Sequence, residues 1–157
     1  MSHHTRRALG AATTLAVLAA TLTACGSDAF QRCVPVAGKG ATPLEVIGSY
    51  EGSGKAGGVR LTLSSGGAMT AEKWLNGSYF GADSGDTFNA SGTWEIQQAT
   101  ASNDRALLRL HFDKPVGFLK GDTLDRLSIG VDATRTFLYD DFDPDVCPDF
   151  RLRLQKP

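Results

Sequence analysis

An alternation of apolar and polar residues along residues 48–154 is the feature that most constrains how this chain can fold. In one stretch the apolar face consists of Phe88, Ala90, Gly92, Trp94 and Ile96. In the next stretch it consists of Ala106, Leu108, Leu110 and Phe112, opposite Leu107, Arg109 and His111. In an extended chain, successive side chains point to opposite faces, so a pattern that repeats every two residues puts all its apolar side chains on one face. Both stretches are therefore predicted to be half-buried β-strands. Trp94 and Phe112 are expected to meet in the core.

Three later segments show the same period. The first has Leu127, Ile129 and Val131 on one face. The second alternates Arg135, Phe137 and Tyr139 with Thr134, Thr136 and Leu138. The last is predicted to direct Phe150, Leu152 and Leu154 inward. The C-terminal third therefore continues the strand pattern.

Glycine-rich turns separate the strands and indicate how they connect. Val59, Leu61 and Leu63 precede Ser65-Gly66-Gly67, and residues 68–75 then run back, which predicts a hairpin. Strands at regular spacing joined by short turns indicate an all-β fold, an antiparallel meander. The simplest way to remove its two edge strands is closure into a small β-barrel, with a two-sheet β-sandwich as the alternative.

One short helical turn is expected before the first strand. Thr42 is a capping residue, Pro43 occupies the first helical position, and Glu45 stands three residues after the cap. This arrangement is typical of a capping box.

The N-terminal segment is built like an export signal. Arg6 and Arg7 supply a basic start without any acid, and residues 8–24 contain no charge. Seventeen uncharged residues diluted by Thr and Gly fall short of the roughly 20 strongly apolar residues that span a bilayer. Thr5-Arg6-Arg7 is also similar to a loose twin-arginine motif, although an ordinary pair of basic residues is the preferred interpretation.

Leu22-Thr23-Ala24-Cys25 resembles the lipobox of bacterial lipoproteins. The resemblance implies cleavage before Cys25 and attachment of a diacylglyceryl group, with palmitate-type chains, to its thiol. The alternative is an ordinary cleavable signal whose cysteine has a structural role. Two acyl chains suffice for stable anchoring, so the expected location is the outer face of the cell membrane.

The cysteine count agrees with this interpretation. The three cysteines are Cys25, Cys33 and Cys147, and an odd number in an exported protein leaves one for another fate. With Cys25 lipidated, Cys33 and Cys147 are predicted to form one disulfide, which an oxidising compartment allows.

Three regions follow from these observations. Residues 1–24 are the expected signal peptide, residues 25–41 the lipidated cysteine and a tether, and residues 42–157 a single β-barrel-like domain. Removal of residues 1–24 takes away two basic residues and no acid, which leaves a net charge of −3. A mildly acidic chain without a clustered basic face argues against nucleic acid as a partner.

Three further segments add to the resemblance. Gly48-Ser49-Tyr50-Glu51-Gly52, residues 59–63 and Ser91-Gly92-Thr93-Trp94-Glu95-Ile96 are similar to segments of small lipoproteins from high-GC bacteria. The Gly-x-aromatic strand opening also looks like that of calycin-type barrels. The resemblance implies an up-and-down barrel at the membrane and carries no catalytic residues.

The search for a chemical site gives few candidates. Asp141, Asp143 and Asp145 alternate as Ca²⁺ ligands could, but the glycine and glutamate of an EF-hand loop are missing, and a plain Asp-Pro turn is favoured. His111 has no sequence-level partner for acid–base catalysis and is interpreted as a surface or structural residue. We therefore expect no enzyme activity, no resident metal and no cofactor.

Two functions remain. The favoured one is a non-enzymatic envelope protein that presents the barrel surface to another protein. The alternative is a barrel that binds an apolar small molecule, with Trp74, Tyr79 and Phe80 lining its mouth.

Overall fold

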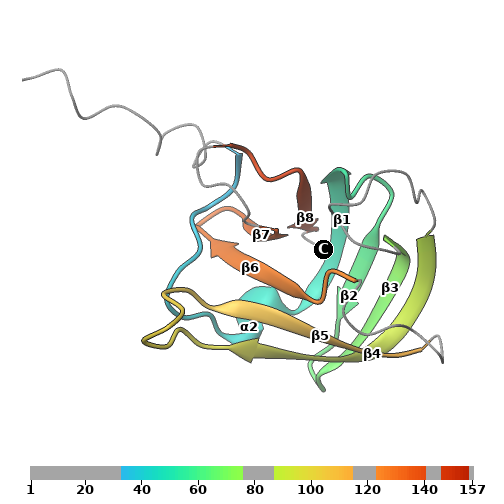
Figure 1. Ribbon diagram of the computed structural model, residues 1–157, viewed down its shortest axis with the longest axis horizontal. Coiled ribbons are helices and arrows are strands. Elements are labelled where there is room, and N and C mark those ends of the chain that lie inside the picture. The colour runs from blue at the N-terminus through green and yellow to red at the C-terminus, as the bar shows by residue number, and fades with distance from the viewer. Residues whose placement is uncertain (1–32, 76–86, 115–122, 141–145, 156–157) are drawn as a thin grey trace, which may run out of the picture.

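The fold is a closed antiparallel barrel of eight strands (Figure 1). The computed structural model describes residues 33–75, 87–114, 123–140 and 146–155. The strands are β1 (Gly48–Gly54), β2 (Arg60–Leu63), β3 (Ala68–Leu75), β4 (Thr87–Gln97), β5 (Leu107–Lys114), β6 (Arg126–Val131), β7 (Thr136–Tyr139) and β8 (Phe150–Leu154). Each strand pairs with the next one along the chain, and β8 pairs with β1 to close the barrel. The predicted meander and its closure are confirmed, and the sandwich alternative does not form.

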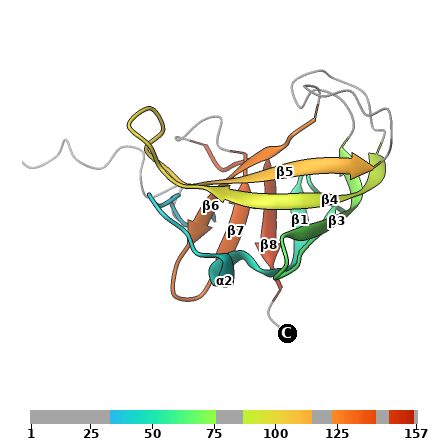
Figure 2. The same cartoon turned by 90° about the horizontal axis from the view of Figure 1, so that it is seen from below.

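The barrel has two distinct ends because its strands run alternately up and down. The helix end carries α2 (Pro43–Val46), the turn at residues 64–67 and the turn at residues 132–135. The disulfide end carries the turn at residues 55–59 and residues 146–149 before β8. Figure 2 shows α2 beside the barrel ends of the strands that meet there.

Local signals account for the connections at the helix end. Thr42 and Glu45 form the expected capping box, in which the Thr42 amide donates to Glu45 Oε2 at 2.7 Å. At the β2–β3 turn Gly67 has φ +79°, a conformation that favours glycine, and the Ser64 amide donates to the Ala68 carbonyl at 2.9 Å. The helical turn and the hairpin are both confirmed.

The barrel interior is an apolar core. Tyr50, Trp74 and Phe150 are its largest fully buried side chains. The Tyr50 hydroxyl donates to the carbonyl of Val46 at 2.6 Å, which joins α2 to the barrel. The inward residues of the last strand behave as predicted, with Phe150 and Leu152 fully buried.

A β-bulge places Trp74 in this core. Met69 and Ala71 are buried, so a regular alternation would direct Lys73 inward. The pairing of β3 with β4 instead shifts between Ala71 and Trp74, and Lys73 has φ +53°. The extra residue reverses the alternation, and Trp74 rather than Lys73 enters the barrel.

The aromatic contacts differ from the expected meeting of Trp94 with Phe112. Phe112 packs against Trp74, with ring centroids 5.9 Å apart, and against Phe88 at the same distance. Trp94 pairs in register with Leu110 and donates its indole N–H to the Ser64 carbonyl at 3.1 Å. Trp94 is thus directed toward the turn at residues 64–67, and the bulge places Trp74 against Phe112 instead.

β7 is apolar on both faces. Leu138 belongs to the barrel core, whereas Phe137 and Tyr139 form a second buried cluster with Val34 outside the barrel. The sequence pattern grouped Phe137 and Tyr139 as the apolar face, but it is Leu138 that faces the core.

The second cluster exists because an N-terminal arm, residues 33–41, lies across the outer face of the barrel. Ala37 makes a β-bridge with Gly130, and the Ala106 amide donates to the Gly38 carbonyl at 2.8 Å. A Cβ at position 130 would collide with the Pro35 carbonyl oxygen, so only glycine permits this close approach. Residues 33–41, assigned to the tether from sequence, are therefore part of the folded domain.

Candidate functional site

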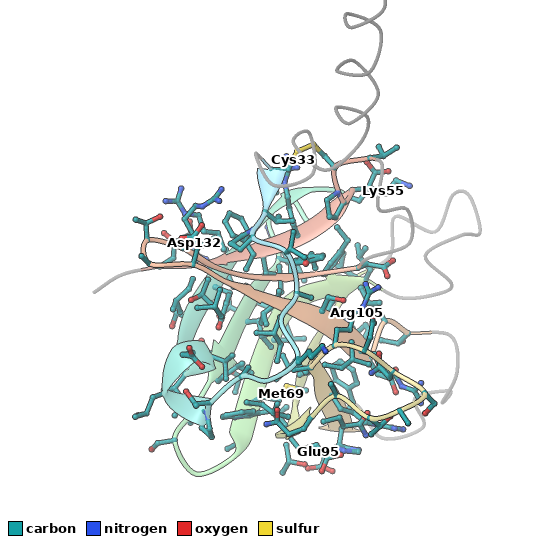
Figure 3. All side chains as sticks on the ribbon, turned by 90° about the vertical axis from the view of Figure 1, so that its left-hand side faces the viewer. Cys33, Lys55, Met69, Glu95, Arg105 and Asp132 are labelled. Atoms are coloured by element: carbon teal, nitrogen blue, oxygen red, sulfur yellow. A yellow bond between two sulfur atoms is a disulfide. The ribbon has the colours of Figure 1, made fainter. Side chains whose placement is uncertain are left out.

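The arm is fixed at its start by the Cys33–Cys147 disulfide, as predicted. The two Cα atoms are 5.7 Å apart, within the usual range for a disulfide. Figure 3 shows Cys33 at the same end of the barrel as Lys55, which lies in the turn after β1. Lys55 Nζ is 3.2 Å from Asp149 Oδ2, just before β8, so the first turn and the segment after Cys147 are joined at this end.

Tyr139 on β7 holds the arm against the outer face of the barrel. Its hydroxyl donates to the Pro35 carbonyl at 3.0 Å, and its ring is fully buried. Burial disfavours the phenolate and raises the pKa of Tyr139 to about 12. The arm is thus attached by a covalent bond, by hydrogen bonds and by apolar contacts.

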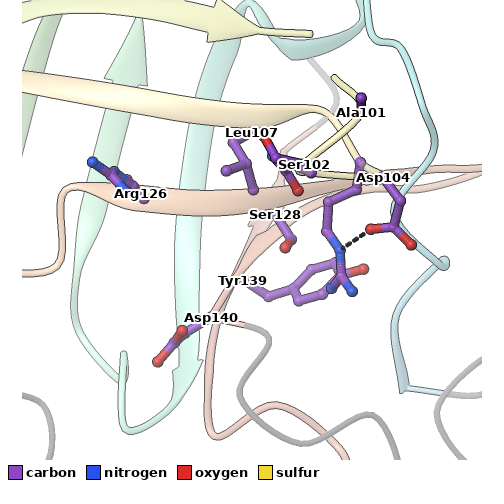
Figure 4. A pocket seen from close by; sticks show the side chains of 10 residues that line it. Ala101, Ser102, Asp104, Leu107, Arg126, Ser128, Tyr139 and Asp140 are labelled. Atoms are coloured by element: carbon purple, nitrogen blue, oxygen red, sulfur yellow. Dashed lines mark hydrogen bonds and ion pairs between the residues drawn. The ribbon is translucent and has the colours of Figure 1, made fainter. Parts of the chain in front are cut away.

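Beside the arm, a polar hollow of about 450 Å³ opens on the outer face of β5, β6 and β7 (Figure 4). Its floor and walls come from Leu107, Arg126, Ser128, Tyr139 and Asp140, and the 101–105 segment closes one side. Ser128 is only 4% exposed, the one buried polar or charged residue among those described. The hollow therefore combines a buried hydroxyl with charged groups at its rim.

The charges around the hollow are of both signs. Asp104 Oδ1 lies 3.3 Å from Arg105 Nε, the pair joined by the dashed line in Figure 4. Burial raises the pKa of the Asp140 carboxyl, which favours its neutral form. Arg126 stands at the end of the hollow away from this ion pair.

A row of charged residues continues from the hollow across the outer face. Arg126 on β6 is directly opposite Arg109 on β5, and Arg109 is opposite Glu95 on β4. Glu95 Oε1 is 3.4 Å from His111 Nε2, and both side chains are about half exposed. His111 is therefore a surface residue paired with a carboxylate.

Of the ligand candidates named from sequence, Trp74 is the one that lies within the described residues. Trp74 is fully buried, packs against Phe150 at 5.5 Å and donates its indole N–H to the Leu124 carbonyl at 3.2 Å. Tyr79 and Phe80 lie outside the described residues. Trp74 thus occupies a core position rather than a position at the described surface.

The remaining candidates also fall outside the described ranges. These are Cys25 with the signal segment, and the calcium candidates Asp141, Asp143 and Asp145. Among the residues that the structure does describe, no group of three or more His, Cys, Asp or Glu side chains is placed to hold a metal ion.

The described part of the chain contains no helix with the length and hydropathy of a membrane span. Comparison with protein-family models, with curated proteins and with solved structures found no match to this chain.

Sequence reasoning missed the residues that form the hollow. The alternation placed Arg109 on the outer face, but Arg126 and Ser128 had no recognisable motif. Their proximity to Arg109 and Leu107 depends on the β5–β6 register, which the chain does not reveal locally. Aligning the two predicted strands would have placed Arg109 opposite Arg126, and this pair of like charges is the signal that could have pointed to the hollow.

Proposed function

We propose that this chain is a membrane-anchored extracytoplasmic lipoprotein, in which Cys25 carries the lipid and the barrel is presented to another component of the cell envelope. The observation that carries the proposal is the pairing of Cys33 with Cys147. This pairing uses two of the three cysteines and leaves Cys25, at the end of the uncharged N-terminal run, as the remaining thiol. A disulfide also agrees with an oxidising compartment outside the cytoplasm.

A non-enzymatic interaction role is supported by the barrel interior. The inward side chains of the described strands form one apolar cluster that includes Tyr50, Trp74 and Phe150. An eight-strand barrel is just wide enough to be filled by its own side chains or to hold one small ligand. The packed cluster favours presentation of the outer surface over the alternative of an apolar ligand inside.

The position of the disulfide supports an orientation for the anchored domain. Cys33 is eight residues after Cys25, which allows a maximum reach of about 26–29 Å in a fully extended chain. The disulfide end would then face the membrane. The helix end would face away from it, with Leu44 of α2 88% exposed as a contact residue for a partner.

Mass spectrometry of the mature protein extracted from its own membrane tests the anchor. We expect an N-terminus at Cys25 with a diacylglyceryl mass increment. We expect the Cys25→Ser protein to be absent from the membrane fraction, because it has no thiol for the lipid. The matched control is Cys33→Ser/Cys147→Ser, which should remain anchored because it retains Cys25. A mature chain that begins elsewhere, or a Cys25→Ser protein that stays in the membrane fraction, would contradict the proposal.

Native mass spectrometry of the same preparation tests the role of the barrel. A defined protein partner whose binding is lost in Leu44→Asp would support the interaction role. A co-purifying small apolar molecule without such a partner would support the alternative function.

A further inference from the structure

The outer face of β5 and β6 carries two arginines that oppose each other directly. Arg109 and Arg126 are register partners in the antiparallel pair. Side chains at opposed positions have Cβ atoms roughly 4.5–5.5 Å apart, and like charges there are destabilising. Within the described residues, neither arginine takes part in an ion pair. The pair is therefore unfavourable in the protein alone.

The nearest acid in the ladder does not resolve this conflict. Glu95 is opposite Arg109 on the other side, but its Oε1 lies toward His111 Nε2 at 3.4 Å and toward Gln97 Nε2 at 3.5 Å. Arg109 Nε is buried and has no hydrogen-bond acceptor in the described structure. A buried donor without an acceptor is costly, so the arginine pair favours a partner that supplies oxygen atoms. Arg126 is the member of the pair that lines the neighbouring hollow, where such a partner can reach it.

The adjoining hollow has room for such a partner. Its volume of about 450 Å³ is within the range of small-ligand sites. Ser128 lies two residues after Arg126 on the same face of β6 and lines the hollow with its hydroxyl group. Figure 4 shows Ser128 on that strand in the middle of the hollow and Arg126 on the same strand at the end of the hollow. A guanidinium and a hydroxyl donor are thus available along one wall.

We propose that Arg126 and Ser128, with Arg109 behind them as the register partner of Arg126, form a binding site for an oxyanion, the phosphate or carboxylate group of a small polar molecule. A guanidinium presents a planar fork of donors that matches the two oxygens of either group. An anion held by Arg126 in the hollow would offset the repulsion between the two arginines. This site is independent of the lipid anchor and of the partner contact at the helix end.

Thermal unfolding of the full chain in detergent, at low ionic strength, tests the site with sodium phosphate and sodium acetate as separate probes. Potassium chloride at equal ionic strength controls for screening. An anion that binds only the folded state, at ten times its Kd, should raise Tm by about 3–6 °C relative to chloride. A larger effect of phosphate identifies a phosphate-bearing ligand, and a larger effect of acetate identifies a carboxylate-bearing one.

Arg126→Gln separates this site from general charge effects. Without added anion it should raise Tm by about 1–4 °C, because the like-charge repulsion is removed. It should also abolish the response to both anions. The matched control is Arg60→Gln, since Arg60 is an exposed strand residue 4.0 Å from Glu51 and 3.8 Å from Glu72. That variant should keep the full anion response.

The proposal is overturned if neither anion exceeds the effect of chloride on the parent protein. It is also overturned if Arg126→Gln responds to the anions as strongly as Arg60→Gln does.

Discussion

Removal of the Cys33–Cys147 bond should destabilise the domain mainly by releasing the unfolded chain. The two residues are 114 positions apart, so the bond closes most of the domain into one loop. The chain-entropy relation gives about 4.8 kcal/mol at 25 °C for a loop of this length. We expect a measured loss of about 3–5 kcal/mol for Cys33→Ser/Cys147→Ser.

The native fold should survive this change, because the arm is also held without the disulfide. Tyr139 donates to the Pro35 carbonyl, Ala37 bridges to Gly130, and Val34 is fully buried. The variant should therefore keep the circular dichroism of the parent protein and slow amide exchange at Ala106, whose N–H donates to the arm. The effect then belongs to the unfolded state.

Urea unfolding of both proteins, each with Cys25→Ser to prevent thiol exchange, measures the difference. At an m-value of about 1.5 kcal/mol/M, the expected loss lowers the midpoint by about 2–3 M. Addition of a reductant should lower the midpoint of the parent to that of the variant and leave the variant unchanged. A midpoint difference below about 0.5 M would refute the loop-entropy reasoning, since the bond would then hardly restrict the unfolded chain.

Two further predictions concern close packing and pH. Gly130→Ala should push the arm, at Pro35, away from β6 and cost about 1–3 kcal/mol in urea unfolding. Gly66→Ala, which has open space around its Cβ position, should change stability by less than about 0.5 kcal/mol. Equal effects of the two substitutions would exclude the close approach as the cause. Hydrogen bonds from the Thr42 backbone and side chain lower the pKa of Glu45 below its ordinary value of 4.5. Hydrogen bonds from the Thr134 backbone and the Arg135 side chain lower the pKa of Asp132 below its ordinary value of 3.8. These two carboxylates stabilise the fold at pH values above their unfolded-state pKa values, and this stabilisation is lost as pH falls through their lower folded-state pKa values. The acid side of a Tm–pH profile should therefore be flatter in Glu45→Gln/Asp132→Asn than in the parent protein. An unchanged profile would contradict this assignment.

Much of the fold follows from interactions within a few residues. The period-two segments, the glycine turn at residues 64–67 and the capping box of Thr42 and Glu45 each depend on neighbours in the chain, and all three are present. The pairing of Cys33 with Cys147 was predicted from the odd cysteine count together with the assignment of Cys25 to lipidation, and the two cysteines are paired. The barrel was the predicted way to pair the edge strands, and β1 pairs with β8.

The candidate site depended on longer-range structure. The polar and charged groups of the hollow come from β5, β6, β7 and the 101–105 segment, and no short motif joins them. Trp74 was considered for a ligand mouth because of its neighbouring loop, but the bulge at Lys73 reverses the strand alternation and buries it. A bulge depends on the partner strand, here β4, so the alternation within β3 could not reveal it.

By itself, the sequence determined that this chain forms a strand meander with one helical turn, because those elements arise from local backbone preferences and a period-two burial pattern. Only the tertiary structure decided which face of β7 enters the barrel and which residues lie opposite each other. Phe137, Leu138 and Tyr139 are all apolar enough to be buried, and the arm, about a hundred residues earlier, covers the outer pair. Likewise, Arg109 meets Arg126 only after β5 and β6 align. Strand register, and which face of a strand the arm covers, depend on segments far apart in the chain. The residues next to a given position therefore do not determine either one.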